Sequence, residues 1–270
     1  ALRHLAAEYR STGQTLPTLL GVNLAPSSIR LATNGTDELP APWAKMDDGT
    51  WFVDPAYLPD APPAMVSPYP ALVPIGDTDI PVDDSATEPT EHDELARSMF
   101  LVNLEFFGHL AVAGSENHAR QAVRAMAIEL AMSPIADDLR LTLVGIGAEL
   151  PDLVGDGRVD YAENADAALD DLRRHAQDID SILDRDDIDS VAAARTTYPG
   201  TDITNPHIVL LAQPVSAAQQ RAFDELSEQH HRLAFAAVTA ADDPAAPWVL
   251  TVSDTDTAHL SPERGTAGMA

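Results

Sequence analysis

Residues Phe100 to Leu150 read FLVNLEFFGHLAVAGSENHARQAVRAMAIELAMSPIADDLRLTLVGIGAEL, and this stretch decides the fold. His109 to Ala113 is a short apolar run that ends at Gly114. From Ala119 to Leu130 apolar residues recur at helical spacing, and a Ser-Pro pair then ends the helix. Leu139 to Val144 is almost continuously apolar, as expected of a parallel strand covered on both faces. The stretch therefore predicts a strand, a glycine turn, a helix and a second strand.

The strand and turn before this helix have the layout of a nucleotide-binding P-loop. That loop has the pattern G-x-x-x-x-G-K-[ST], and its backbone N–H groups bind phosphate at a helix N-terminus. Gly114 occupies the first position, but Ala119, Arg120 and Gln121 stand where Gly, Lys and Ser or Thr are required. The alanine adds a methyl group, the guanidinium is broader than an ammonium, and the amide cannot replace the Mg²⁺-binding hydroxyl. We expect little affinity for nucleotide.

Residues 1–60 predict a small α+β lobe. Its expected elements are helices at Leu2 to Arg10 and Pro17 to Leu24, a strand at Ser28 to Ala32 and a hairpin at Trp43 to Val53.

Residues 61–98 predict a proline-rich and acidic linker with one strand, Ala71 to Ile75. Asp77 to Ala96 is so acidic and so poor in apolar residues that we expect a mobile loop. Its Asp spacing superficially resembles a calcium loop, but the glycine and terminal Glu of an EF-hand are missing.

Residues 99–255 predict the main α/β domain, and residues 256–270 a flexible tail. A capping box at Ser216 and Gln219 indicates a helix that continues to about His230. The other elements expected after the βαβ unit are strands at Arg158 to Tyr161, His207 to Ala212, Leu233 to Val238 and Trp248 to Val252, and helices at Ala165 to Leu183 and Ser190 to Arg195. Alternating strands and helices predict an α/β fold whose mostly parallel sheet is covered by helices on both faces.

Composition limits the possible partners. The 16 basic and 43 acidic residues give a net charge of −27, which argues against nucleic acid and anionic membranes as direct partners. Cysteine is absent, which excludes thiolate metal sites and cysteine nucleophiles. No apolar run is long enough to span a bilayer. The chain begins at Ala1 and ends in small and polar residues, so we expect a fragment of a larger protein.

The chain resembles the motor domain of FtsK/SpoIIIE-type translocases, a RecA-like P-loop family that includes type VII secretion motors. Val102 to Gly114 matches the segment before the P-loop, and Asp138 to Leu150 matches the strand after its helix. The family's strand ending in Asp-Glu aligns with Ile208 to Gln213, which puts Ala212 and Gln213 at the positions of those acids. The resemblance implies a RecA-like fold that lacks the Walker A lysine and the Walker B acids, and hence no ATPase activity.

The arrangement also resembles a module of large, membrane-anchored bacterial proteins that carry LysM and bacterial transcriptional activator domains. That resemblance implies a cytoplasmic location and partners among the other domains of the same polypeptide. It implies no direct membrane contact from this fragment.

Other site chemistry is weakly indicated. His230 and His231 are adjacent on a helix and point in different directions, so we expect no metal site. Ser115 lies at a strand-to-helix turn but not in a nucleophile motif, and we expect it to cap the helix. Arg124, and Arg120 with it, could bind an anion, although pairing with carboxylates is the simpler interpretation.

Three functional hypotheses remain. The first is a non-catalytic pseudo-ATPase that acts as an interaction or regulatory scaffold and binds a protein or peptide near Gly114 to Arg120, without a cofactor. The second is a nucleotide sensor that binds ATP or ADP through Arg120 without hydrolysis. The third, a hydrolase with an unrelated site, has no residue constellation in its favour.

Overall fold

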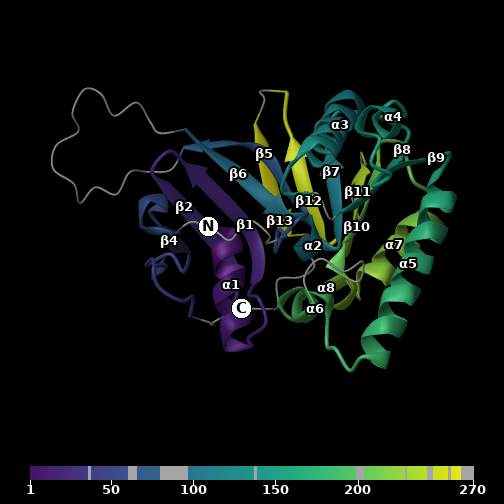
Figure 1. Ribbon diagram of the computed structural model, residues 1–270. Helices are drawn as coiled ribbons and strands as arrows, with labels where there is room; N and C mark the ends of the chain where they lie inside the picture. Colours follow the sequence, from purple (N-terminus) through teal and green to yellow (C-terminus); the bar gives the residue numbers. More distant parts are fainter. Residues whose placement is uncertain are drawn as a thin grey trace.

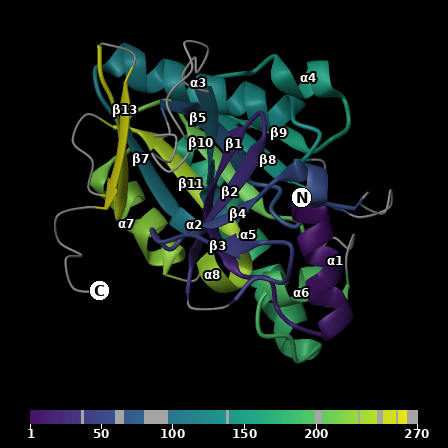
Figure 2. The ribbon, with the colours of Figure 1, turned by 90° about the vertical axis from the view of Figure 1, so that its left-hand side faces the viewer.

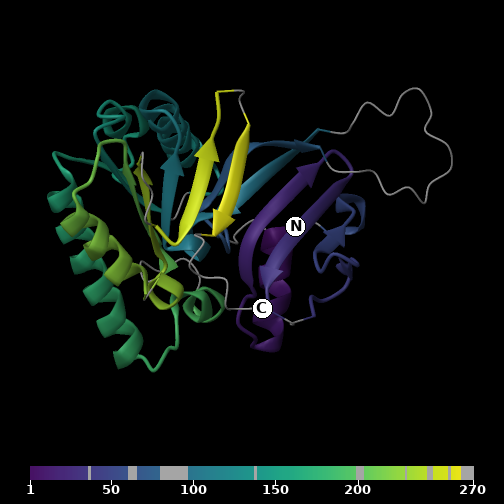
Figure 3. The same ribbon diagram turned by 180° about the vertical axis from the view of Figure 1, so that it is seen from behind.

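The computed structural model describes residues 1–35, 38–59, 66–79, 97–136, 139–198, 204–228, 230–241, 246–254 and 257–262. Two sheets organise these residues, one of six strands and one of seven (Figure 1). The C-terminal hairpin of the seven-stranded sheet stands between the rest of that sheet and the N-terminal lobe (Figure 3).

The seven-stranded sheet has the order β13-β12-β7-β11-β10-β8-β9. Its strands are β7 (His109–Ala113), β8 (Arg140–Val144), β9 (Val159–Ala162), β10 (His207–Leu211), β11 (Phe235–Ala240), β12 (Trp248–Val252) and β13 (Ala258–Pro262). All neighbours are parallel except β12 and β13, which are antiparallel. The predicted parallel sheet is therefore present, with one antiparallel strand at its edge.

Helices cover both faces of this sheet, as predicted. The helices are α2 (Leu104–Phe107), α3 (Glu116–Met132), α4 (Leu150–Val154), α5 (Ala165–Arg185), α6 (Val191–Thr197), α7 (Ala217–Ser227) and α8 (His230–Leu233). In β10, Ile208 and Leu210 belong to the core under α3, whereas Val209 and Leu211 belong to the core under α5. Because side chains alternate along a strand, all five residues of β10 are buried.

The six-stranded sheet is entirely antiparallel and has the order β3-β4-β2-β1-β6-β5. Its strands are β1 (Thr18–Ala25), β2 (Ser28–Asn34), β3 (Ala44–Lys45), β4 (Trp51–Val53), β5 (Leu72–Asp79) and β6 (Arg97–Asn103). In Figure 2 the lobe that contains this sheet faces the viewer, and α1 (Leu2–Thr12) lies beside α6. A single mostly parallel sheet is thus an incomplete description of the fold.

The strands β5 and β6 of the six-stranded sheet contribute side chains to two cores, one of which they share with the seven-stranded sheet. Leu72 and Leu101 pack in the core beneath α1, whereas Val73 and Val102, one residue further along, pack in the core of α3. The predicted boundary between residues 98 and 99 falls within β6, so one sheet includes residues on both sides of it.

Several local predictions change. The helix predicted at Pro17 to Leu24 is wrong, because this segment is β1 and pairs with both β2 and β6. Residues 77–79 of the predicted acidic loop belong to β5, and residues 80–96 lie outside the described chain. The strand β13 lies in the predicted tail, of which residues 263–270 are not described. Among the described residues, no helix is both long and apolar enough to cross a membrane.

Candidate functional site

A crevice of about 490 Å³ opens at the carboxyl ends of the parallel strands. It lies where β7, β10 and β11 lead into the segments that follow them, the usual position for ligands in an open α/β sheet. The lining residues come from α3, from the β10–α7 connection, from the first turns of α7 and from the end of β11: Glu116, Ala119, Arg120, Ala212, Gln213, Pro214, Val215, Ala217, Gln220, Ala240 and Ala241. Its volume is typical of a small-molecule or peptide-anchor site.

Four of the six residues selected from the sequence line this crevice. Ala119 and Arg120 reach it from the first turns of α3, and Ala212 and Gln213 reach it from the end of β10. Gly114, which follows β7, is not a lining residue. Gln121 does not line the crevice either, and its side chain donates to Asn117 Oδ1 at 3.2 Å. The position predicted for Asp138 lies outside the described residues.

The turn between β7 and α3 is short. The helix begins at Glu116, three residues earlier than predicted, so only Gly114 and Ser115 separate strand from helix. Ser115 is the N-cap, and its Oγ accepts from the His118 backbone N–H at 3.4 Å, which confirms the predicted cap. The His118 Nδ1 lies 3.0 Å from Asp254 Oδ1. Residues 116–118, which would wrap a phosphate in a P-loop, form the first turn of the helix instead.

Gly114 serves the contact between β7 and β12. Its φ is +146°, and a Cβ added there would lie 2.5 Å from the Val252 carbonyl oxygen. Glycine is required because the backbone of β12 approaches so closely. The group that requires glycine here is thus the Val252 carbonyl of the same protein.

Arg120 crosses the crevice to the end of β8. One of its Nη atoms donates to the Gly145 carbonyl oxygen at 2.8 Å. A Cβ on Gly145 would lie 3.4 Å from the Gln213 Cβ, so Arg120 and Gln213 both lie next to Gly145. Arg124 pairs with Glu149 at 3.2 Å, as predicted, but both side chains are more than half exposed and the pair stabilises the fold little.

Gln220 was not foreseen. It lies one turn into α7, where its Nε2 is 3.2 Å from His109 Nδ1 and 3.4 Å from Asp224 Oδ1. The capping box at Ser216 is present and fixes the start of this helix. Because this capping box can be recognised in the sequence, it marks the first turn of α7, where Gln220 lies.

Thr239, His109 and Asp224 have the hydrogen-bond order of a nucleophile triad. His109 Nε2 lies 3.1 Å from Thr239 Oγ1, and His109 Nδ1 lies 2.9 Å from Asp224 Oδ1. His109 and Thr239 are completely buried, and neither lines the crevice. Because a substrate cannot reach the hydroxyl, we assign the cluster to the core.

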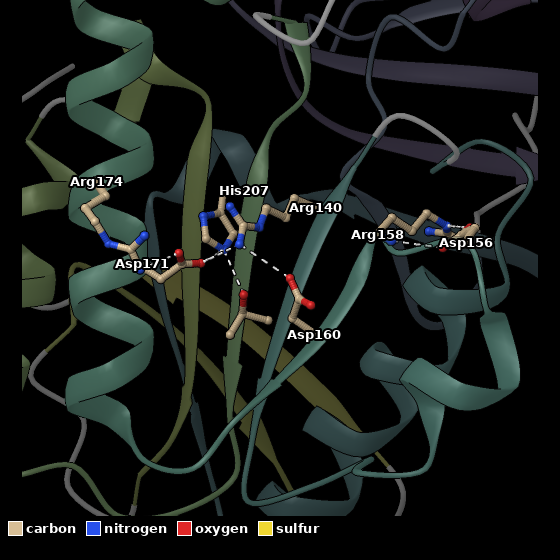
Figure 4. A network of polar contacts seen from close by, with 8 residues as sticks. Arg140, Asp156, Arg158, Asp160, Asp171, Arg174 and His207 are labelled. Atoms are coloured by element: carbon tan, nitrogen blue, oxygen red, sulfur yellow. Dashed lines mark hydrogen bonds and ion pairs between the residues drawn. The ribbon is translucent and has the colours of Figure 1, made fainter.

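A second buried polar cluster joins β10 to α5 (Figure 4). His207 Nε2 lies 2.9 Å from Thr142 Oγ1, and Asp171 pairs with Arg140 at 2.9 Å. Burial is the main cause that lowers the pKa of His207 well below its usual value, and His175 and Arg140 add to it. Burial and Arg140 likewise lower the pKa of His175. Both imidazoles are therefore neutral packing groups at neutral pH.

No group of three or more His, Asp or Glu residues in the described part of the chain could hold a metal ion. The predicted calcium-like spacing falls mostly on residues 80–96, outside that part.

Comparison with known proteins gives distant structural likenesses. Neither a protein-family model nor a curated protein sequence matches the chain. The cytoplasmic domain of the type VII secretion ATPase EccC from Thermomonospora curvata is 16% identical at a TM-score of 0.47, over 69% of this chain and 22% of that one. The pCW3 conjugation coupling protein TcpA, solved with ATPγS, is 10% identical at a TM-score of 0.39, over 93% and 82%. EccC ATPases 2 and 3 with a signal-sequence peptide are 16% identical at 0.42, over 75% and 36%.

These likenesses do not define a family, because every one of the three TM-scores is below 0.5. The chain spans about a fifth of the length of the EccC cytoplasmic domain. The structure has a mixed α/β architecture with a crevice at the carboxyl ends of its parallel strands.

Proposed function

We propose that this chain is a degenerate P-loop domain of the FtsK/SpoIIIE type that acts as a non-catalytic interaction or regulatory module of a larger bacterial protein. Its sheet supports the proposal. The strand β7, which leads into α3, lies next to the central strand β11, and β11 separates it from β10, which Ala212 and Gln213 follow. The residues at the Walker A positions, Ala119 and Arg120, and those at the Walker B positions, Ala212 and Gln213, therefore line the same crevice.

The short turn after β7 carries the proposal. A P-loop binds phosphate through free backbone N–H groups at a helix N-terminus. Here the Ser115 hydroxyl accepts from one of these groups, the His118 N–H. Glu116, in the first turn, adds a carboxylate to the crevice at the end of the helix that would otherwise attract phosphate. A triphosphate would meet this like charge.

The end of β10 supports the same conclusion. Ala212 has no oxygen to hold a metal-bound water, and the Gln213 amide cannot accept a proton as a general base. Both residues line the crevice, so they occupy the place where those functions would be needed.

The crevice suits a protein segment. Five alanines line it, and small side chains leave room for those of a partner. The amides of Gln213 and Gln220 offer donors and acceptors of the kind that pair with a peptide backbone. Its partner in this proposal is a protein or peptide, which includes other domains of the same polypeptide.

Calorimetry tests the non-catalytic assignment. Titration of ATP into the purified chain, with and without Mg²⁺, should give no heat of binding in the micromolar range, because both phosphate and metal contacts are missing. Mg²⁺-dependent binding at micromolar concentration would refute the proposal.

Arg120 favours a second candidate, a nucleotide sensor without hydrolysis, because its guanidinium lines the crevice. In that case ATP or ADP should raise the melting temperature, and Arg120→Ala should abolish the shift. Arg124→Ala, four residues further along an exposed helix face, is the matched control. Absence of a shift in the unmodified chain would eliminate this candidate.

We also propose a cytoplasmic location beside a membrane anchor elsewhere in the polypeptide. Protease treatment of spheroplasts tests this location. The domain should be protected until the cells are lysed, and digestion in intact spheroplasts would contradict it.

A further inference from the structure

A pocket of about 190 Å³ lies on the N-terminal lobe and shares no residue with the crevice. β1 contributes Gly21 and Asn23 to its lining, β2 contributes Arg30 and Ala32, and β6 contributes Phe100. Pockets for drug-sized ligands have volumes of about 300–1,000 Å³. This pocket therefore suits a smaller molecule.

The pocket lies on the face of the six-stranded sheet that is turned away from α1. Directly opposite residues of paired strands share a face, and Asn23 is opposite both Arg30 and Phe100. Val22 and Leu31, which adjoin Asn23 and Arg30 in the chain, point the other way into the core beneath α1. The strand register thus gathers an amide, a guanidinium and an aromatic ring on one surface.

Small residues keep this surface hollow. Gly21 and Ala32 lie opposite each other on β1 and β2. A Cβ added to Gly21 would lie 2.7 Å from the Leu101 carbonyl oxygen and 3.1 Å from the Phe100 ring, so the position accepts only glycine. Apolar surface from Ala32 and Phe100 therefore lies beside the polar groups of the pocket.

Two opposite charges line the pocket, those of Arg30 and of Asp48, which lies in the turn between β3 and β4. The Asp48 Oδ1 accepts from Thr50 Oγ1 at 2.6 Å and from the Thr50 backbone N–H at 2.9 Å. These hydrogen bonds lower the pKa of Asp48, and the nearby Arg30 guanidinium lowers it further. Asp48 is therefore ionised at neutral pH.

The two charges do not pair with each other. Among the described residues neither Arg30 nor Asp48 makes an ion pair, although both line one small pocket. An anion in the pocket is attracted by Arg30 and repelled by Asp48, and a cation is attracted and repelled in the reverse way. A molecule that carries both charges gains from both groups.

We propose that this pocket binds a free α-amino acid with an apolar side chain, independently of the crevice and of the function proposed for it. The carboxylate of the amino acid accepts from the planar guanidinium of Arg30, and its ammonium donates to Asp48. The side chain packs on Ala32 and Phe100. Because Asp48 is exposed and Arg30 is only half-buried, the ion pairs are weak and we expect a Kd of about 1 mM.

A ¹H–¹⁵N NMR titration of the full chain with each standard α-amino acid tests the proposal. At least one apolar amino acid should shift the amide signals of Gly21, Asn23 and Ala32 saturably, with a midpoint of about 1 mM. The signals of Ala119 and Gln213, at the crevice, should remain in place. Absence of saturable shifts at the pocket up to about 20 mM of every amino acid would overturn the proposal.

Two derivatives of the amino acid that binds best test whether both charges are recognised. The N-acetyl derivative keeps the carboxylate and lacks the ammonium, whereas the amide keeps the ammonium and lacks the carboxylate. Each should bind about fivefold more weakly than the free amino acid. Equal binding of either derivative would reveal a simple anion or cation site and would contradict the proposal.

Two variants assign the charges to their groups. Arg30→Gln should weaken binding of the free amino acid about fivefold without weakening that of its amide, which has no carboxylate for Arg30. Asp48→Asn should have the same effect without weakening the N-acetyl derivative. Arg173→Gln, an exposed position on α5, is the control and should change neither affinity.

Equal losses for the free amino acid and its derivative in these variants would show that the substitutions alter only the shape of the pocket, and would refute the assignment. If a variant fails to fold, the comparison of the free amino acid with its two derivatives on the unmodified chain decides the question.

Discussion

Gly114 illustrates how a residue type that fits a P-loop can serve another purpose. Its positive φ and the 2.5 Å approach of the Val252 carbonyl oxygen to a built Cβ explain glycine without any ligand. Glu116, which would be a loop residue in a P-loop, is the first residue of α3. The glycine is a packing residue in this fold.

Gly114→Ala should therefore destabilise the protein strongly. The backbone conformation disfavours a Cβ, and β12 would have to move, so we expect a loss of about 3 kcal/mol or more in the free energy of unfolding. Urea denaturation measures it. Gly157→Ala is the control, because its φ of +77° is strained but no atom lies within 4 Å of the added Cβ, and it should cost about 1–2 kcal/mol. Equal losses in the two variants would contradict this role.

The crevice residues were predictable where a motif placed them at the end of a strand. The P-loop spacing located Ala119 and Arg120, and the resemblance to the FtsK/SpoIIIE motor domain located Ala212 and Gln213. All four line the crevice, because the carboxyl ends of parallel strands meet at one edge. The Gly145 partner of Arg120 was not predictable, because that contact joins residues 25 apart across the sheet and depends on tertiary packing.

At the scale of single elements, α3 depends on a residue outside it. Arg158, from the turn before β9, donates to the carbonyl oxygens of Leu130, Ala131 and Ala136 (its pair with Asp156 is drawn in Figure 4). These carbonyls lie at or beyond the helix C-terminus, where no intrahelical donor reaches them.

Arg158→Ala should cost about 2–4 kcal/mol, because it leaves carbonyls at a partly buried helix end without a charged donor. Arg158→Lys should recover only part of this, since an ammonium cannot span the three oxygens. Chemical denaturation measures both. Arg173→Ala removes an exposed pair with Asp170 and should change stability by less than about 0.5 kcal/mol. A loss for Arg158→Ala no larger than this control would show that the cap is unimportant.

The contact between β10 and α5 should respond to pH. The pKa values of His175 and His207 are lowered in the folded state, so below about pH 6.5 the unfolded chain binds protons that the folded chain does not. Stability is therefore full above that pH and falls as the pH decreases, by up to about 1.4 kcal/mol per pH unit for each imidazole.

Denaturation series between about pH 7.5 and 5.5 measure this effect. A His175→Gln/His207→Gln variant should lose less stability over this range than the unmodified chain. The neighbouring charges Arg140, Asp171 and Asp160 remain in both proteins, so they do not account for a difference. An identical slope in the two would refute the assignment.

Element prediction succeeded where periodicity was local and failed where pairing was distant. The helix at Ala165 to Leu183 was found because its buried residues recur on one face. The helix predicted at Pro17 to Leu24 is instead the strand β1, because this segment pairs with β6 almost 80 residues later. That pairing left no periodic signal in either segment.

At the scale of the whole molecule, the sequence predicts an α/β domain and a small N-terminal α+β lobe, but not the six-stranded antiparallel sheet that includes β5 and β6. Five of its strands begin before the acidic stretch and the sixth, β6, follows it. The acidic composition predicted a linker between these segments, whereas hydrogen bonds join them in one sheet. The lobes meet through a shared core and through Arg195 of α6, which donates to the Pro68 carbonyl oxygen.

The net charge of −27 should make the stability depend on salt. Self-repulsion disfavours the compact state, and raising KCl from about 0.02 to 0.5 M shortens the screening length several-fold. We expect the melting temperature to rise over this range. A melting temperature that stays constant or falls would show that ion pairs outweigh the repulsion.

The central claim is that the N-terminus of α3 serves the fold and does not receive a nucleotide. Its most direct measurement is a ¹H–¹⁵N NMR titration with Mg²⁺-ATP that follows the amides of Gly114 to Gln121 and of Gln213. The account predicts that these signals remain in place up to millimolar nucleotide. Saturable shifts confined to these residues at micromolar ATP would contradict it.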